Sequence, residues 1–161
     1  MGLQSDLEAG VAAMEAEFAR ASAVGPFGRY YAALLATGQE KLGRFESALE
    51  IVGRALETVT EPGVGLFVSE LHRLKGMCLL QRGRSSVDDA MSSLRAAVGV
   101  ARAQHATLLE VRAATSLARA AINQCRGSED VDALRTLCAS LPSTFDAPEL
   151  HEAEKLLSIA R

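Results

Sequence analysis

Three pairs of residues, each spaced by seven positions, constrain this chain more than any other feature of its sequence. In each pair a small residue is followed by a residue at a turn: Ala36 and Gly43, Gly76 and Gly83, Ala118 and Cys125. A small residue within a helix lets a neighbouring helix approach closely, and the turn residue ends the helix. The pattern therefore predicts three helical hairpins, of which the central one runs from Phe67 to Arg102.

The second helix of each predicted hairpin carries small or apolar residues at steps of four and three. These positions are Ala48, Val52 and Ala55; Ala90, Leu94 and Ala97; and Ala133, Leu137 and Ser140. Such steps place side chains on one face of a helix. The three sets begin 42 and 43 residues apart, so the pattern is an internal repeat and predicts a stack of similar helical units.

We expect one domain over residues 1–161, with hairpins at about 27–60, 65–103 and 107–141. An N-terminal helix is expected at about 3–23 and a capping helix at about 147–160. Capping signals favour helix starts at Ser5 with Glu8, Thr107 with Glu110, Ser128, and Asp146 with Pro148 and Glu149. The first helix has an apolar stripe at Leu7, Val11, Met14 and Phe18. In the second, Tyr31, Leu34, Leu35 and Leu42 continue in helical phase.

Composition favours an all-α protein, and the net charge gives no reason to expect binding to nucleic acid or membranes. Hydrophobic residues make up 48%, yet aromatics only 4%, so the core is built from small aliphatic side chains that suit close helix packing. The formal net charge is -3, which predicts no direct binding to nucleic acid or an anionic membrane. Three cysteines without CxxC spacing, and no visible signal peptide, favour a cytoplasmic location.

The repeat resembles the tetratricopeptide pattern, although its period is longer than the usual 34 residues. Three motifs carry a more specific resemblance: ELHRLKG at 70–76, EVRAATSLAR at 110–119 and FDAPELHEAEKLL at 145–157. In their order and spacing they are similar to the C-terminal helical-repeat region of large bacterial multidomain ATPase regulators. Cys125 stands where that family usually has a glycine. The resemblance implies a tetratricopeptide-like α-solenoid of about eight antiparallel helices with a C-terminal capping helix.

In that family an adenylate-cyclase-like or winged-helix DNA-binding domain comes first, an ATPase module follows, and the helical tail comes last. The resemblance therefore implies a regulatory or interaction tail in signal transduction or transcription regulation. No GxxxxGK[ST] motif occurs in this chain, so nucleotide hydrolysis is not expected of it. We expect no enzymatic activity, because no nucleophile, base and orienting group converge, and we expect no cofactor or metal site.

The repeat phase predicts which side chains line the inner surface of the array, and we call this set the predicted groove. Its members are Tyr30, Thr37, Glu70, Arg73, Met77, Arg112, Thr115, Arg119 and Asn123. Arginine forks match carboxylates, so this surface is a candidate site for an acidic or carboxy-terminal peptide. The alternative is that Arg73 and Arg112 form structural bridges with Glu70 and Glu110. The sequence leaves both interpretations open.

Two functions follow from these patterns. The first is a non-catalytic protein-interaction scaffold that binds a protein, a peptide or other domains of a larger regulator. The second is a domain that senses a small-molecule effector and transmits its binding to an ATPase or DNA-binding domain. A homodimer is also considered, because an end helix of an array can leave an apolar edge uncovered.

Overall fold

The computed structural model describes residues 2–20, 26–59, 65 and 67–160, and the side chains of residues 4–16, 28–59, 65 and 67–160. These residues form eight α-helices and no strand. The helices are α1 (Gly2–Arg20), α2 (Pro26–Lys41), α3 (Phe45–Glu57), α4 (Val68–Gln81), α5 (Val87–Ala103), α6 (Thr107–Asn123), α7 (Glu129–Ser140) and α8 (Pro148–Ile159). A short 3-10 helix, η1 (Arg84–Ser86), precedes α5. The predicted Phe18 side chain and the breaks at 21–25 and 60–63 lie outside the described residues.

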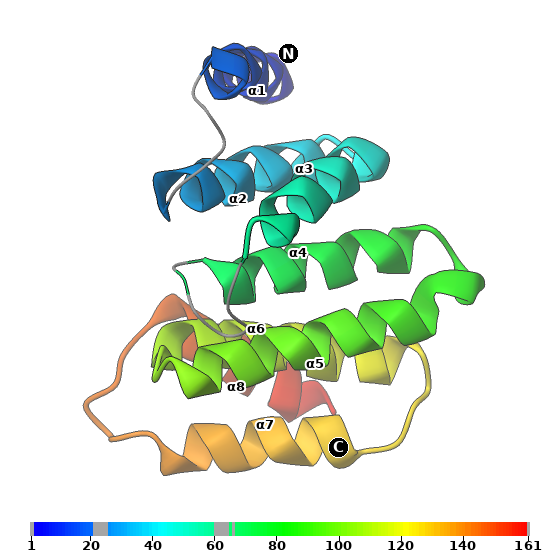
Figure 1. Cartoon of the computed structure of the whole chain (residues 1–161). Coiled ribbons are helices and arrows are strands. Elements are labelled where there is room, and N and C mark those ends of the chain that lie inside the picture. Colours follow the sequence, from blue (N-terminus) through cyan, green and yellow to red (C-terminus); the bar gives the residue numbers. More distant parts are fainter. Residues whose placement is uncertain (1, 21–25, 60–64, 66, 161) are drawn as a thin grey trace.

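From α1 to α7 the helices follow one another along the stack in the order of the chain, and α8 turns back to pack against α6 (Figure 1). Among the described residues, each helix contacts only helices one or two positions away in sequence. Helices α2, α4, α6 and α8 contact one another in series. Each of α3, α5 and α7 packs against two successive members of that series, while α1 packs against α2. Helices α4 and α6 each contact four other helices of the described part of the chain, so both lie in the interior of the fold.

The predicted pairing of a small residue with a turn residue is confirmed three times. Ala36, Gly76 and Ala118 are all buried. The turn residues seven positions later all have positive φ: Gly43 at 72°, Gly83 at 102° and Cys125 at 51°. A residue with left-handed backbone conformation just after a helix allows the next backbone amides to donate hydrogen bonds to the last carbonyls of that helix. At α6 this closure is made by the Arg126 amide, which donates to the Ala121 carbonyl at 2.9 Å.

The core consists of three successive clusters rather than one. The first joins α2, α3 and α4 and includes the predicted residues Ala48, Val52 and Ala55. The second lies mainly between α5 and α6 around Met91 and Leu94. The third joins α6, α7 and α8 around Leu134. Small alanines fill much of each cluster, which allows the close approach that the low aromatic content predicts.

In the third hairpin the predicted buried face is wrong. Ala133 and Ser140 are exposed on α7, and Leu137 is only partly buried. The buried residues are Val131 and Leu134. Helix α7 packs against both α6 and α8, so the face between those two helices is buried. That face carries the bulkier aliphatic side chains, whose burial removes more apolar surface from water than alanine or serine would.

The predicted capping boxes are also wrong at the first and sixth helices. Helix α1 already includes Gly2, so Ser5 lies inside the helix and not before it. At α6 the residue that precedes the helix is Ala106, and Thr107 is its first residue. The Glu110 carboxylate does not reach back to the helix start but accepts a hydrogen bond from Arg102 Nε at 2.8 Å. An ion pair with α5 has replaced the expected cap.

The starts of α7 and α8 are closer to the prediction. Ser128 precedes α7 as expected, although its side chain makes no capping hydrogen bond. Pro148 is in the first turn of α8 as predicted, but the capping position belongs to Ala147 and not to Asp146. The Asp146 carboxylate instead lies 2.9 Å from His151 Nε2. Proline fixes φ near its helical value, so it sets this start without a side-chain cap.

Candidate functional site

The residues of the predicted groove lie on α2, α4 and α6, which are consecutive members of the helix series. They differ widely in exposure. Tyr30 is 37% exposed and Asn123 is also exposed, whereas Glu70 and Thr115 are only 9% and 3% exposed. Exposure therefore varies even within one helix, since Thr115 is buried and Asn123 is exposed on α6.

Glu70 and Arg73 form the centre of a charged cluster on α4. The Arg73 guanidinium donates two hydrogen bonds to the Glu70 carboxylate, from Nε at 2.9 Å and from Nη2 at 2.8 Å. Both are mostly buried: counting side-chain atoms alone, Arg73 is 14% exposed and Glu70 is 12% exposed. Burial acts to lower the pKa of Arg73, but the bond to Glu70 and the nearby charges of Glu70, Glu40 and Glu152 outweigh it and raise that pKa. The bridge from Arg73 to Glu70 that the second interpretation predicted is therefore present.

Glu40 on α2 is a further carboxylate in the same region. Burial raises its pKa, Arg73 partly offsets that effect, and Glu70 adds to it. Glu40 therefore lies near the Arg73–Glu70 pair without a hydrogen-bonded cation of its own among the described residues. The excess carboxylate disfavours an acidic partner at this end of the surface.

Helix α8 supplies acidic partners to the two arginines of α6. Arg112 Nη2 donates to Glu149, and Arg119 Nη2 donates to Glu152 at 2.6 Å. Arg112 Nη1 also lies 3.9 Å from Glu70 Oε2, which links this pair to the α4 pair. The hydrogen bond from Arg112 lowers the pKa of Glu149. The predicted bridge between Arg112 and Glu110 is wrong, because Glu110 pairs with Arg102.

Three other predicted residues have local structural partners. The Thr37 hydroxyl donates to the Ala33 carbonyl at 2.7 Å, and the Thr115 hydroxyl donates to the Val111 carbonyl at 2.8 Å. Met77 is partly buried and packs against the α5–α6 cluster. The polar groups of both threonines are therefore satisfied within their own helices.

Sequence reasoning missed Glu149 and Glu152 as members of this surface. It treated α8 only as a capping helix, although two of its carboxylates pair with arginines of α6. Each carboxylate lies more than thirty positions from its arginine, so no local spacing rule joins them. The available signal was the repeat itself, because the helix that follows a hairpin packs against the first helix of that hairpin.

Apolar side chains flank the charged cluster. The described residues include six exposed large hydrophobic side chains, and five of them lie on α2 and α6: Tyr30, Tyr31, Leu34, Leu108 and Ile122. Tyr31 and Leu34 were predicted to continue a packed apolar stripe, but they are 50% and 39% exposed. The Tyr30 ring is held in place by Phe67, with ring centroids 5.0 Å apart.

Leu108 and Ile122 lie on the same face of α6 as Arg112 and Arg119, one turn before and one turn after them. On α2, Leu34 is one turn from Tyr30. Apolar side chains therefore stand on both sides of a row of paired charges. We call this surface of α2, α4 and α6 the inner surface. Apolar anchors next to satisfied charges are the composition typical of protein interfaces.

The buried thiol of Cys78 and the potential metal ligands are the remaining reactive groups considered among the described residues. Burial raises the pKa of the Cys78 thiol to about 12, and nearby Glu40 adds to this effect. In the part of the chain that the structure describes, no three His, Cys, Asp or Glu side chains gather as a metal site would require. None of the described helices has the length and apolar character needed to cross a membrane.

Comparison of the chain with protein-family models, with curated proteins and with solved structures finds no match. The functional interpretation therefore depends on the geometry of this chain and on the motifs quoted above.

Proposed function

We propose that this chain is a tetratricopeptide-like α-solenoid that serves as a non-catalytic protein-interaction module. The arrangement of contacts supports the solenoid part of the proposal. Helices α2, α4, α6 and α8 contact one another in series, and the helices between them each contact two members of that series. Contacts restricted to neighbouring units are typical of repeat arrays.

The observation that carries the interaction function is the position of the exposed apolar side chains. Five of the six in the described part of the chain belong to α2 and α6, the two helices that flank α4. Exposure of large apolar groups to water is unfavourable. Their burial by a partner is favourable and adds to the free energy of binding. Leu34 and Leu108 are the anchors we expect a protein partner to bury, because the charges between them are already paired.

The charged cluster indicates which charge the partner should carry. An acidic peptide would have to compete with Glu149 and Glu152 for Arg112 and Arg119, and it would meet Glu40 and Glu70 at the other end. A partner with apolar groups and a lysine or arginine near Glu40 fits this surface better. The motif resemblance extends the proposal to a regulatory tail of a bacterial ATPase regulator of signalling or transcription.

Capture experiments with three proteins test the interaction function. Immobilised wild-type chain, the double variant Leu34→Ser/Leu108→Ser and the control Ile159→Ser are incubated with extract of the source cells. Ile159 is 74% exposed, is the last residue of α8 and is not a member of the inner surface. We expect wild type and control to enrich the same protein and the double variant to bind it at least about tenfold more weakly. Equal enrichment by all three proteins would refute the assignment of the inner surface.

A further inference from the structure

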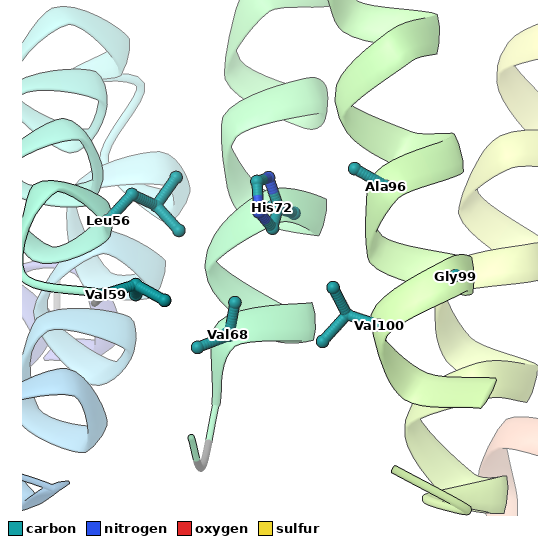
Figure 2. A pocket seen from close by; sticks show the side chains of 7 residues that line it. All are labelled: Leu56, Val59, Val68, His72, Ala96, Gly99 and Val100. Carbon is teal, nitrogen blue, oxygen red and sulfur yellow. The ribbon is translucent and has the colours of Figure 1, made fainter. Parts of the chain in front are cut away.

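An apolar groove lies between α3 and α5, with α4 as its floor (Figure 2). It encloses about 520 Å³. Leu56 and Val59 border it at the end of α3, Val68 and His72 form the floor, and Gly99 and Val100 border it on α5. The groove exists because α3 and α5 both pack on α4 but do not contact each other. Its volume is in the range of small-molecule sites.

The floor of the groove is one stripe of α4 that leads to a basic residue. Val68 and His72 line the groove, and Lys75 follows His72 by three positions on the same stripe. Glu70, Arg73 and the rest of the charged cluster lie on the opposite side of α4. The groove is therefore separate from the inner surface, and its occupation does not depend on the proposed interaction function.

His72 and Lys75 are the polar groups that a ligand in the groove could contact. Burial lowers the pKa of His72, and the positive charge of nearby Lys75 lowers it further. The imidazole is therefore neutral at physiological pH and can donate or accept a hydrogen bond. Among the described residues, no carboxylate forms an ion pair with Lys75. An aliphatic groove thus adjoins an uncompensated cation.

From this combination we propose that the groove binds the free form of a linear aliphatic carboxylate, a fatty acid. Its hydrocarbon chain lies against Leu56, Val68 and Val100, and its carboxylate reaches His72 and Lys75. Burial of the chain in an aliphatic groove supplies most of the affinity. The charge-assisted hydrogen bond from Lys75 selects a carboxylate over an uncharged or cationic head group.

Calorimetric titration with sodium decanoate, decanol and decyltrimethylammonium tests the proposal on the full chain. We expect saturable binding of decanoate, binding of decanol that is about tenfold weaker, and no binding of the cation. Decanoate that fails to bind, or binds no more tightly than the cation, would overturn the proposal.

Two variants locate the site. A side chain added at Gly99 points into open space, because no atom lies within 4 Å of an added Cβ. Gly99→Leu should therefore fold, fill the groove and abolish decanoate binding. The control Gly10→Leu, on α1, has equally open surroundings and should bind like wild type. Lys75→Gln should weaken decanoate binding about tenfold and leave decanol binding unchanged. Wild-type affinity in folded Gly99→Leu would overturn the assignment.

Discussion

Gly76 shows how one missing side chain sets the distance between two helices. A Cβ added there would lie 2.6 Å from Leu94 Cγ and 2.9 Å from the Ala90 carbonyl oxygen. These distances are shorter than van der Waals contact, and one of the two atoms belongs to the backbone, so α4 and α5 would have to move apart. The glycine is therefore required by packing, which offsets its weak intrinsic preference for a helix.

We predict that Gly76→Ala lowers the free energy of unfolding by roughly 1–2 kcal/mol, because the overlap with α5 exceeds the gain in helix propensity. Urea unfolding followed by circular dichroism measures it. Gly53→Ala on α3 is the matched control, since nothing lies within 4 Å of its added Cβ. The control should be unchanged or stabilised by up to about 1 kcal/mol. A stabilised Gly76→Ala would show that the two helices are not in close contact.

Cys125 adopts a conformation that glycine adopts more readily. Its φ is 51°, in the left-handed region, where a Cβ crowds the neighbouring carbonyl oxygen. The equivalent positions Gly43 and Gly83 carry no such crowding. We predict that Cys125→Gly raises the free energy of unfolding by up to about 1 kcal/mol, after the greater freedom of glycine in the unfolded chain is subtracted.

The same urea measurement checks Cys125→Gly, with Cys125→Ser as the control. Serine removes the thiol but keeps the Cβ, so it should leave stability close to that of the wild type. If serine stabilises the chain as much as glycine does, the thiol and not the backbone conformation is the cause.

At the scale of elements, α8 is fastened to α6 by charges as well as by apolar contacts. The Arg112 hydrogen bond lowers the pKa of Glu149 in the folded chain. A lowered carboxylate pKa adds stability above the unfolded value of about 4.3, and this stability is lost as the pH falls through the folded value. We predict that Glu149→Gln is less stable than the wild type at neutral pH and that the difference is smaller at pH 3, which is below the unfolded pKa of the carboxyl group.

Hydrogen exchange of the α8 amides, measured at neutral pH and at pH 3, tests this prediction. Glu154→Gln is the control, because Glu154 is exposed on the same helix and forms no ion pair with the described residues. The control should match wild type at neutral pH. A Glu149→Gln difference of the same size at both pH values would mean that the Arg112 pair does not hold α8.

The order of the eight helices could be predicted because small residues and turn residues recur at a fixed spacing. The buried face of α7 could not, because Ala133 and Leu137 continue the repeat while contact with both α6 and α8 favours Val131 and Leu134. The candidate site was predictable only in part. Arg73 finds Glu70 within one helical turn, whereas the partners of Arg112 and Arg119 come from a helix far along the chain.

At the scale of the whole molecule, stability is distributed along the stack. The three core clusters lie one after another, and among the described residues contacts join only helices one or two positions apart. In such a fold, total stability approximates a sum of unit terms and nearest-neighbour terms. A local loss of packing should therefore open its own end of the stack before it affects the other end.

We predict that Leu134→Ala and Val52→Ala destabilise different ends of the chain. Both side chains are fully buried, Leu134 in the α6–α8 cluster and Val52 in the α2–α4 cluster. Leu134→Ala should cost about 2–5 kcal/mol locally, because it removes apolar contacts and leaves a cavity. Native-state hydrogen exchange should then speed up in α6, α7 and α8 but change little in α2 and α3. Val52→Ala should show the reverse. If either variant accelerates hydrogen exchange equally in all helices, the stack unfolds as one cooperative unit. Its two ends would then be coupled more strongly than contacts between neighbouring helices explain.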